Sequence, residues 1–382
     1  MGQCRRYVDP RPNLKFPVKR LIPLLFGPLT VLGWALLAAV TARAQVDAAP
    51  PTPAVVGLQA ALGRYEAIAA SGGWPSVPGG PTIEPGSCDP RVSAVAKRLA
   101  ATGDLDPRYT GARVYDVPLQ AAVRAFQSRH GLEADALVGR RTLAAMNVPA
   151  KARAAQLRLN LERTRALFAN APGRFLLVNI PAFEAYLVND GATVWSTKVI
   201  VGETDNETPL LEDEIEYLVL NPTWTVPRSI ATKELLQRIQ TDPGFLERGG
   251  YDVIDQGGRS VDPAGIDWAS LTANDFPYVL VQRAGPVNEL GSVKFMFPNP
   301  YGVCMHDTSS PYLFEYAKRA FSHGCIRMDR PVDFAERLLE PLGWTREAID
   351  GQLESGETRT ITLEKALPVL VTYLTANVDE AG

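Results

Sequence analysis

The spacing of apolar residues along this chain of 382 residues changes near position 172. Before that point apolar side chains recur every three or four residues, as along 56–69 and 119–130, which is the period of an amphipathic helix. After it, branched and aromatic residues gather in short runs such as 174–181 and 194–201, which are typical of strands. A chain that switches period in this way is expected to be an α+β multidomain protein, helical first and β-rich afterwards.

The helical part is predicted to hold three segments. A scaffold helix is expected over 56–69, before a stretch rich in Gly and Pro. Short helices follow, and Gly131 is placed to end the middle one as a C-cap. A connecting helix is expected over 150–168. The predicted segments are the linker and scaffold helix at 45–89, the short helices at 90–148 and the connecting helix at 149–172.

The β-rich part is expected to form one domain over residues 173–377. The segment at about 228–292 is too long to be a simple connecting loop. Insertions of this length usually form lids or binding loops. It carries one helix signal, at 230–239. Two closing strands are expected, at 358–363 and 368–374.

The N-terminus has the pattern of an export signal over residues 1–44. Basic residues precede an apolar run at 21–42, which closes on Ala42-Arg43-Ala44, a small-x-small cleavage site. The apolar run is long for a cleaved signal, so an uncleaved membrane anchor stays open as the alternative. Either form predicts an exported protein of the periplasm or cell envelope.

The charge balance of the exported part bears on its partners. Residues 1–44 hold seven of the 39 basic and one of the 42 acidic residues, so the remainder carries nine more acidic than basic side chains. Nucleic acid is a polyanion and is bound by basic surfaces. We therefore expect no nucleic-acid partner.

Three cysteines follow the export signal: Cys88, Cys304 and Cys325. An odd number leaves one thiol unpaired, and in an oxidising compartment this favours a reactive nucleophile over a structural disulfide. Cys304 lies two residues before His306, and such residues share one face of a strand. An oxidative bond between Cys304 and Cys325 that blocks activity is therefore a hypothesis.

A candidate acyl-transfer site is centred on Ser322-His323-Gly324-Cys325. An imidazole within hydrogen-bond reach makes a thiolate available near neutral pH, and His306 is the predicted partner of Cys325. Gly324 lets a carbonyl approach the backbone, so the N–H groups of Gly324 and Cys325 are predicted to receive the developing oxyanion. Ser322 is expected to hydrogen bond within the loop.

The side chains around this pair have predicted supporting roles. His306 is expected near the end of a hairpin over 293–307. Because Asp307 faces the opposite side of its strand, a backbone carbonyl near residue 307 is predicted to hold the imidazole. His323 and Arg327 flank the sulfur, where either would raise the local positive charge or meet a substrate carboxylate, with loop scaffolding as the alternative.

The sequence predicts no metal and no cofactor. It has three histidines and neither a His-Glu-x-x-His nor a Cys-x-x-Cys spacing, so a protein-bound zinc site is not expected. It also lacks a Gly-x-Gly-x-x-Gly run after a strand and a Gly-x-x-x-x-Gly-Lys-Ser/Thr run. Nucleotide cofactors are therefore unsupported.

Fifteen residues separate His306 from Ser322, and the run His-x15-Ser-His-Gly-Cys resembles the signature of the YkuD-type L,D-transpeptidases, in their branch with a long lid. The run 122–132, followed by Asp135-Ala136, resembles the three-helix peptidoglycan-binding domain of many wall enzymes. The resemblance covers roughly 72–377. It implies a small helical peptidoglycan-binding domain and a β-rich YkuD-like catalytic domain with a helical and loop lid.

This resemblance implies a cysteine-dependent transferase of cell-wall biogenesis and cell shape. Such enzymes attack the carbonyl of the third residue in a peptidoglycan tetrapeptide stem, release D-alanine and pass the acyl group to an amine, which gives a 3→3 cross-link when the amine belongs to another stem. Stem peptides and glycan are the implied partners. With water as acceptor the same site is an L,D-carboxypeptidase. A non-catalytic wall-binding protein that works through 90–148 is the other hypothesis.

Overall fold

The computed structural model describes residues 52–378. The export signal or anchor expected over 1–44 lies outside these described residues. Among the helices within 52–378, none combines the length and the apolar character needed to cross a membrane.

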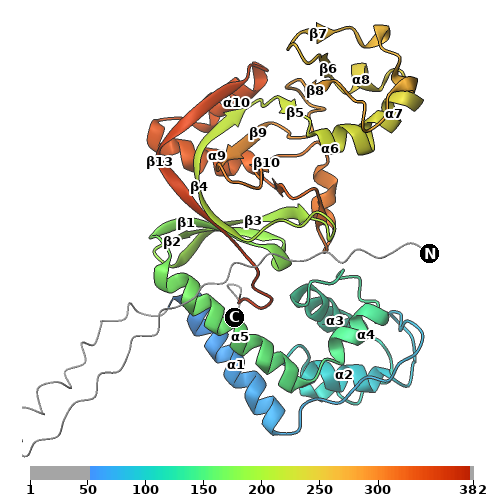
Figure 1. Cartoon of the computed structure of the whole chain (residues 1–382). Helices are drawn as coiled ribbons and strands as arrows, with labels where there is room; N and C mark the ends of the chain where they lie inside the picture. Colours follow the sequence, from blue (N-terminus) through green and yellow to red (C-terminus); the bar gives the residue numbers. More distant parts are fainter. Residues whose placement is uncertain (1–51, 379–382) are drawn as a thin grey trace, which may run out of the picture. The chain divides into compact units, whose positions relative to one another are not determined.

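The described chain begins with five α-helices that precede the first strand (Figure 1). The helices predicted over 56–69 and 150–168 are confirmed, each a few residues longer than expected. Both lack Gly and Pro between their predicted ends apart from two tolerated glycines in the first. The helices are α1 (Pro53–Ala70), α2 (Val92–Ala100), α3 (Val117–Arg129), α4 (Arg140–Met146) and α5 (Ala150–Asn170).

The helices α2, α3 and α4 share one apolar core. Leu99, Leu119 and Phe126 are fully buried in it. Gly131 follows α3 with φ +63°, the left-handed conformation that was predicted for a residue ending this helix. Ala136 adopts φ +64° and is also fully buried, so this loop holds a left-handed turn without a glycine.

A nine-stranded sheet forms the β-rich part, in the order β11-β3-β12-β10-β9-β4-β13-β1-β2. An additional pairing joins β2 to β3, so the sheet closes on itself (Figure 1). Strands β10 and β12, which carry the candidate site, lie inside this order between β3 and β9. The strands are β1 (Arg174–Asn179), β2 (Glu184–Asn189), β3 (Ala192–Gly202), β4 (Leu211–Leu220), β9 (Val293–Met296), β10 (Met305–His306), β11 (Ala320–Ser322), β12 (Ile326–Met328) and β13 (Arg359–Thr372).

Helix α9 (Pro331–Leu339) packs its apolar side against the core of this sheet. Phe334 is fully buried, stacks on Trp195 with ring centroids 5.3 Å apart, and meets Phe295 of β9 edge-on at 5.0 Å. Helix α10 (Arg346–Glu354) follows and was not predicted. It is short and buries only Ile349, so it lacks a long apolar period.

The prediction of two closing strands was wrong, because β13 is one strand of 14 residues. It pairs with β4 along its length, with a shift of register between Thr362 and Leu367. A bulge of this kind takes up extra residues without ending the strand. The charged pair Glu364-Lys365 within it interrupts the apolar pattern, which made the sequence look like two strands.

The insertion expected about 228–292 supplies three strands of a small sheet in the order β5-β8-β6-β7, and the fourth strand, β5, lies just before the insertion. Its predicted helix is confirmed as a continuous helical run with a π-helical turn at Ala231–Leu235. The strands β6, β7 and β8 were not predicted, because two to four residues are too few to show a period. The elements are β5 (Trp224–Thr225), α6 (Arg228–Ile230), α7 (Leu236–Thr241), α8 (Phe245–Arg248), β6 (Tyr251–Ile254), β7 (Ser260–Val261) and β8 (Val279–Gln282).

Candidate active site

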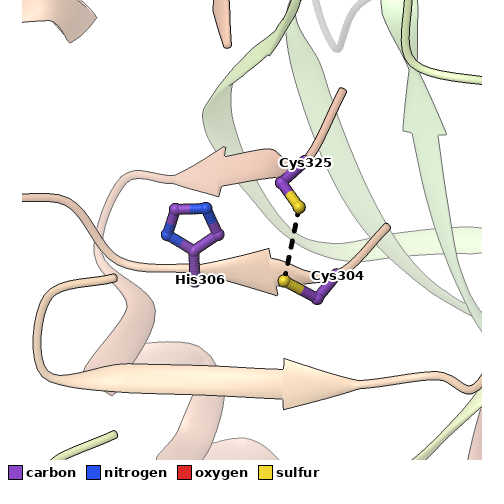
Figure 2. Close-up of side chains that lie close together, drawn as sticks. All are labelled: Cys304, His306 and Cys325. Atoms are coloured by element: carbon purple, nitrogen blue, oxygen red, sulfur yellow. Dashed lines mark hydrogen bonds between the residues drawn. The ribbon is translucent and has the colours of Figure 1, made fainter. Parts of the chain in front are cut away.

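Two parallel strands bring the candidate site together. His306 on β10 pairs with Arg327 on β12. One step earlier, the N–H of Ile326 donates to the carbonyl of Cys304 over 2.9 Å. Alternate residues share a face of a strand. Cys304 and His306 therefore lie beside Cys325 and Arg327, and Figure 2 shows the two sulfurs and the imidazole together.

The sulfur of Cys325 lies 3.5 Å from the sulfur of Cys304. Both sulfurs and a ring nitrogen of His306 lie within 4.8 Å of one another. Cys304 and His306 are buried, with 6% and 5% of their surfaces exposed, whereas Cys325 is partly exposed. The predicted pair of Cys325 and His306 is thus brought together, and Cys325 is the thiol of the cluster that solvent reaches.

The imidazole of His306 is held by the backbone. Its Nδ1 lies 2.5 Å from the carbonyl oxygen of Asp307. A carbonyl accepts only, so Nδ1 carries the proton of this hydrogen bond and Nε2 is left for the sulfur. A carbonyl near residue 307 was predicted for this task, and the structure has it at residue 307 itself.

The surroundings of Cys325 favour its thiolate. A hydrogen bond from Cys304 has the largest effect on the pKa of Cys325 and lowers it. The hydrogen bond and the charge of His306 lower it further, whereas burial raises it. The resulting pKa of Cys325 is about 4. The pKa of Cys304 is raised, because its thiol proton is held by Cys325 and because it is buried. Cys304 is therefore the thiol donor and Cys325 the thiolate.

The loop before Cys325 is fixed by hydrogen bonds of its own polar groups and of Thr208. The hydroxyl of Ser322 donates to the carbonyl of Cys325 over 2.5 Å and accepts the N–H of Gly324 at 3.2 Å. Thr208 donates its hydroxyl to the carbonyl of Gly324 over 2.8 Å. Gly324 has φ +108°, a conformation that side chains other than glycine rarely adopt.

These contacts differ from the predicted oxyanion donors. The N–H of Gly324 already has an acceptor, because the Ser322 hydroxyl bends back over the loop. The prediction that Ser322 hydrogen bonds within the loop is met by this same contact. Thr208 was not predicted, because it lies far from Gly324 in the sequence and belongs to no motif.

The carboxylate of Asp307 acts on the backbone and not on the imidazole. Its Oδ2 accepts the N–H of Ser292 at 2.8 Å and the hydroxyl of Ser292 at 2.7 Å. Ser292 begins the approach to β9, which is the antiparallel neighbour of β10. Asp307 thus ties together the two strands of the hairpin that carries His306.

His323 points to the insertion. Its Nε2 lies 2.8 Å from a carboxylate oxygen of Glu234, and both side chains are 40% exposed. Glu234 belongs to the π-helical turn at Ala231–Leu235. The structure therefore joins the loop of the nucleophile to the insertion through this contact, a partner for His323 that no local signal in the sequence could indicate.

Arg327 is the remaining basic side chain of the site. It is partly buried, and desolvation lowers its pKa, although Glu289, Cys325 and Tyr312 favour its charged form. Its buried Nε has no hydrogen-bond acceptor among residues 52–378. A buried guanidinium nitrogen without a partner is costly, so the charge of Arg327 is incompletely satisfied within the described chain.

The cluster of Cys304, His306 and Cys325 also presents two sulfurs and one nitrogen as donor atoms. Soft divalent metals such as zinc prefer this set. This donor set was not predicted, because the sequence has no metal-binding spacing. The two cysteines are 21 residues apart and come together only through strand pairing.

A thiolate next to an imidazole whose far nitrogen is held by an acceptor is the arrangement of cysteine enzymes that transfer acyl groups. The comparisons with known families agree with this class. Residues 173–358 match the family model of the L,D-transpeptidase catalytic domain, YkuD, and residues 88–146 match the model described as "Putative peptidoglycan binding domain". Residues 173–358 are thus a catalytic domain of the YkuD family, which follows a helical domain of the peptidoglycan-binding family.

Among curated proteins, one from Haemophilus influenzae named "Putative L,D-transpeptidase" is 33% identical over 229 residues. The match covers 59% of this chain and 46% of that protein, so the chain spans about half the length of this relative.

Solved structures of L,D-transpeptidases also overlap with the chain. The one from Xylanimonas cellulosilytica is 16% identical, covering 77% of this chain and 99% of that one with a TM-score of 0.22. The one from Stackebrandtia nassauensis is 14% identical, covering 78% and 96% with a TM-score of 0.26. TM-scores this low carry no argument, and the family assignment rests on the two family models.

Proposed function

We propose that this protein is a cysteine-dependent L,D-transpeptidase of peptidoglycan. Cys325 would attack the carbonyl of the third residue in a tetrapeptide stem, form a thioester and release D-alanine. The acyl group would then pass to an amine, giving a 3→3 cross-link when that amine belongs to a second stem. No cofactor takes part in these steps.

The observation that carries this proposal is the arrangement of Cys325 and His306 within a domain of this family. The sulfur is the partly exposed member of the cluster, and Nδ1 of His306 is held 2.5 Å from the Asp307 carbonyl. The same imidazole can therefore give a proton to the leaving amine and take one from the acceptor amine without turning its ring. This supports an acyl-enzyme mechanism over a role in binding alone.

Arg327 is the proposed contact for a substrate carboxylate. The sequence left His323 and Arg327 as equal alternatives, and His323 is already paired with Glu234. Arg327 has a buried Nε without an acceptor in the described chain and lies on the same strand face as Cys325. A tetrapeptide stem ends in a carboxylate, which a guanidinium binds well.

The oxyanion is proposed to be bound by the N–H of Cys325. The N–H of Gly324 would join it only if the Ser322 hydroxyl turned away, because that hydroxyl accepts it now. Ser322 is then a loop-positioning residue and Asp307 a positioning residue for the hairpin of His306.

The helical domain is proposed to bind the glycan and keep the enzyme on its polymer. Together with the export signal predicted over residues 1–44, this supports a proposed location in the periplasm or cell envelope, either free after cleavage or anchored. The proposed domains are those predicted above: 45–89, 90–148, 149–172 and 173–377, with the insertion about 228–292 as a lid over the acyl site.

Mass spectrometry after incubation with a carbapenem tests the nucleophile. An adduct on Cys325 is expected in the unaltered protein and in Cys88→Ala, whose thiol is exposed and outside the site. Cys325→Ala should give no adduct. An adduct that persists in Cys325→Ala would refute the assignment of the nucleophile. A protein that never acylates would favour the non-catalytic wall-binding alternative.

Purified tetrapeptide stems distinguish transfer from hydrolysis. Cross-linked dimers are the expected product of the unaltered protein. If only tripeptides and free D-alanine appear, water is the acceptor and the protein is an L,D-carboxypeptidase that uses the same site.

A further inference from the structure

Cys304 forms no covalent bond in the acyl-transfer steps proposed above, yet its sulfur lies 3.5 Å from that of Cys325. We propose that Cys304 is a resolving thiol, which forms a reversible disulfide with Cys325 when a peroxide oxidises the nucleophile. This goes beyond the proposed function and depends only on the reactivity of the Cys325 sulfur, whatever its acyl substrate.

The backbone allows the bond to form. Cys304 and Cys325 directly precede β10 and β12, which are parallel neighbours, and the N–H of Ile326 donates to the Cys304 carbonyl. Neighbouring strands are about 4.8 Å apart, within the Cα separation of about 4.4–6.8 Å that disulfides span. Both side chains lie on one face, as Figure 2 shows. The sulfurs need to approach by about 1.5 Å to reach bonding distance, which side-chain rotation can supply.

The two thiols differ in a way that suits an attacking and a resolving role. Cys325 is partly exposed, so a small oxidant reaches it, whereas Cys304 is only 6% exposed. The lowered pKa of Cys325 and the raised pKa of Cys304 agree with this division, because the thiolate is the form that peroxides oxidise. Cys304 is therefore shielded from the oxidant and still in contact with the sulfur that it would rescue.

The chemistry balances with hydrogen peroxide as the oxidant. The Cys325 thiolate attacks one peroxide oxygen, the O–O bond breaks, and Cys325 becomes a sulfenic acid while hydroxide leaves and takes a proton. The sulfur of Cys304 then attacks the sulfur of Cys325, the S–O bond breaks, and the second oxygen leaves as water with the Cys304 proton. Two thiols lose two electrons in total and one peroxide becomes two waters. A dithiol reductant returns the two electrons and frees Cys325.

The disulfide would mask the nucleophile and also protect it. A sulfenic acid without a neighbouring thiol is oxidised further to sulfinic acid, which dithiols do not reduce. With Cys304 in contact, the sulfur is trapped at a reversible stage. The proposal therefore predicts that oxidation stops acylation and that a reductant restores it.

The first test is a direct search for the bond. The full chain in a Cys88→Ser background, which removes the exposed third thiol of the described residues, is treated with hydrogen peroxide, alkylated and digested with trypsin. Cleavage after Lys294, Lys318, Arg319 and Arg327 places the two cysteines in different peptides, 295–318 and 320–327. A disulfide-linked pair of these peptides is expected before reduction and is lost after dithiothreitol. Sulfinic acid on 320–327 in place of the linked pair would overturn the proposal.

The second test compares Cys88→Ser with Cys88→Ser/Cys304→Ala. After peroxide, dithiothreitol should restore full iodoacetamide labelling of Cys325 in the first protein and little in the second, where sulfinic acid accumulates. Equal recovery in both would overturn the role of Cys304. The linked peptides of the first test need no variant at Cys304, so they decide the matter even if Cys304→Ala folds poorly.

Neither readout requires turnover. A protein that forms the disulfide and yet gives no carbapenem adduct or cross-linked stems keeps the redox proposal and loses the proposed function. A protein that acylates without ever forming the linked peptides keeps the proposed function and loses the redox proposal. A metal chelator in all samples removes competition by metal ions for the same three donor atoms.

Discussion

Nδ1 of His306 lies 2.5 Å from the carbonyl oxygen of Asp307, the residue that directly follows it. The imidazole is thus oriented by its own strand, and no acidic side chain is needed for the task. The carboxylate of Asp307 binds Ser292 instead, which fixes the backbone that presents the carbonyl. The orientation of the base therefore depends on how well this hairpin is held.

The thiolate of Cys325 should react with iodoacetamide at pH values where ordinary thiols are protonated. Cys304 first, and then His306, lower its pKa to about 4 from the ordinary 9.0. Because the thiolate is the reactive form, the rate should stay level as pH falls below neutral and decline only as pH passes through about 4. The labelling rate of peptide 320–327, followed against pH in Cys88→Ser, measures this.

Two variants assign the causes of that low pKa. Cys304→Ala and His306→Ala should each move the inflection of the labelling rate to higher pH, since each removes a group that stabilises the thiolate, and Cys304→Ala should have the larger effect. An inflection near 9.0 in the unaltered site would contradict the geometry of the cluster.

The contact between His323 and Glu234 should hold the insertion near the nucleophile. A contact between side chains with this exposure is worth at most about 1 kcal/mol, so Glu234→Gln should increase local opening by up to about fivefold. Hydrogen exchange of the amides in 231–241 measures the change. Glu247→Gln, an exposed carboxylate on α8 of the same insertion, is the matched control and should leave the exchange unaltered. Equal exchange in all three proteins would show that the pair does not restrain the insertion.

Loss of the Asp307 carboxylate should destabilise the hairpin. Asp307→Ala leaves the Ser292 N–H and hydroxyl without their acceptor, and hydrogen bonds to a charged group are worth about 1.5–3 kcal/mol. Ser292→Ala removes only the hydroxyl bond, so its cost should be about half. Denaturant unfolding gives the free energies. The rate of Cys325 labelling should fall more in Asp307→Ala, because the carbonyl that orients His306 loses its support.

Two glycine substitutions should change stability in opposite directions. Gly291 has φ +62°, and a Cβ there would lie 2.4 Å from Cγ of Asp307. Gly291→Ala should therefore cost about 2 kcal/mol or more. Gly351 lies inside α10, and a Cβ there would meet nothing within 4 Å. Gly351→Ala should raise the free energy of unfolding by about 0.5–1 kcal/mol. Similar effects of both substitutions would contradict this contrast.

The candidate pair itself could be predicted from the sequence. Cys325 and His306 were found from a short motif at a fixed spacing, and the switch of period near residue 172 predicted the helical and β-rich parts. These features depend on residues close together in the chain, where periodicity and motif spacing act directly.

Other features depended on distant packing. The continuity of β13 is decided by its pairing with β4, and the small sheet of the insertion is built from strands too short to show a pattern. Glu234, the partner of His323, lies in an element that carries no motif. The N–H of Gly324 is accepted by the Ser322 hydroxyl, which turns back on its own loop.

The amino-acid sequence alone identified Cys325 and His306 as the candidate nucleophile and base, and the class of domain that holds them. Tertiary structure alone decided that the sulfurs of Cys304 and Cys325 lie 3.5 Å apart and that His323 pairs with Glu234. The physical reason is register: which residues face each other on β10 and β12 is set by the closure of the whole sheet, and no local pattern in either strand records it.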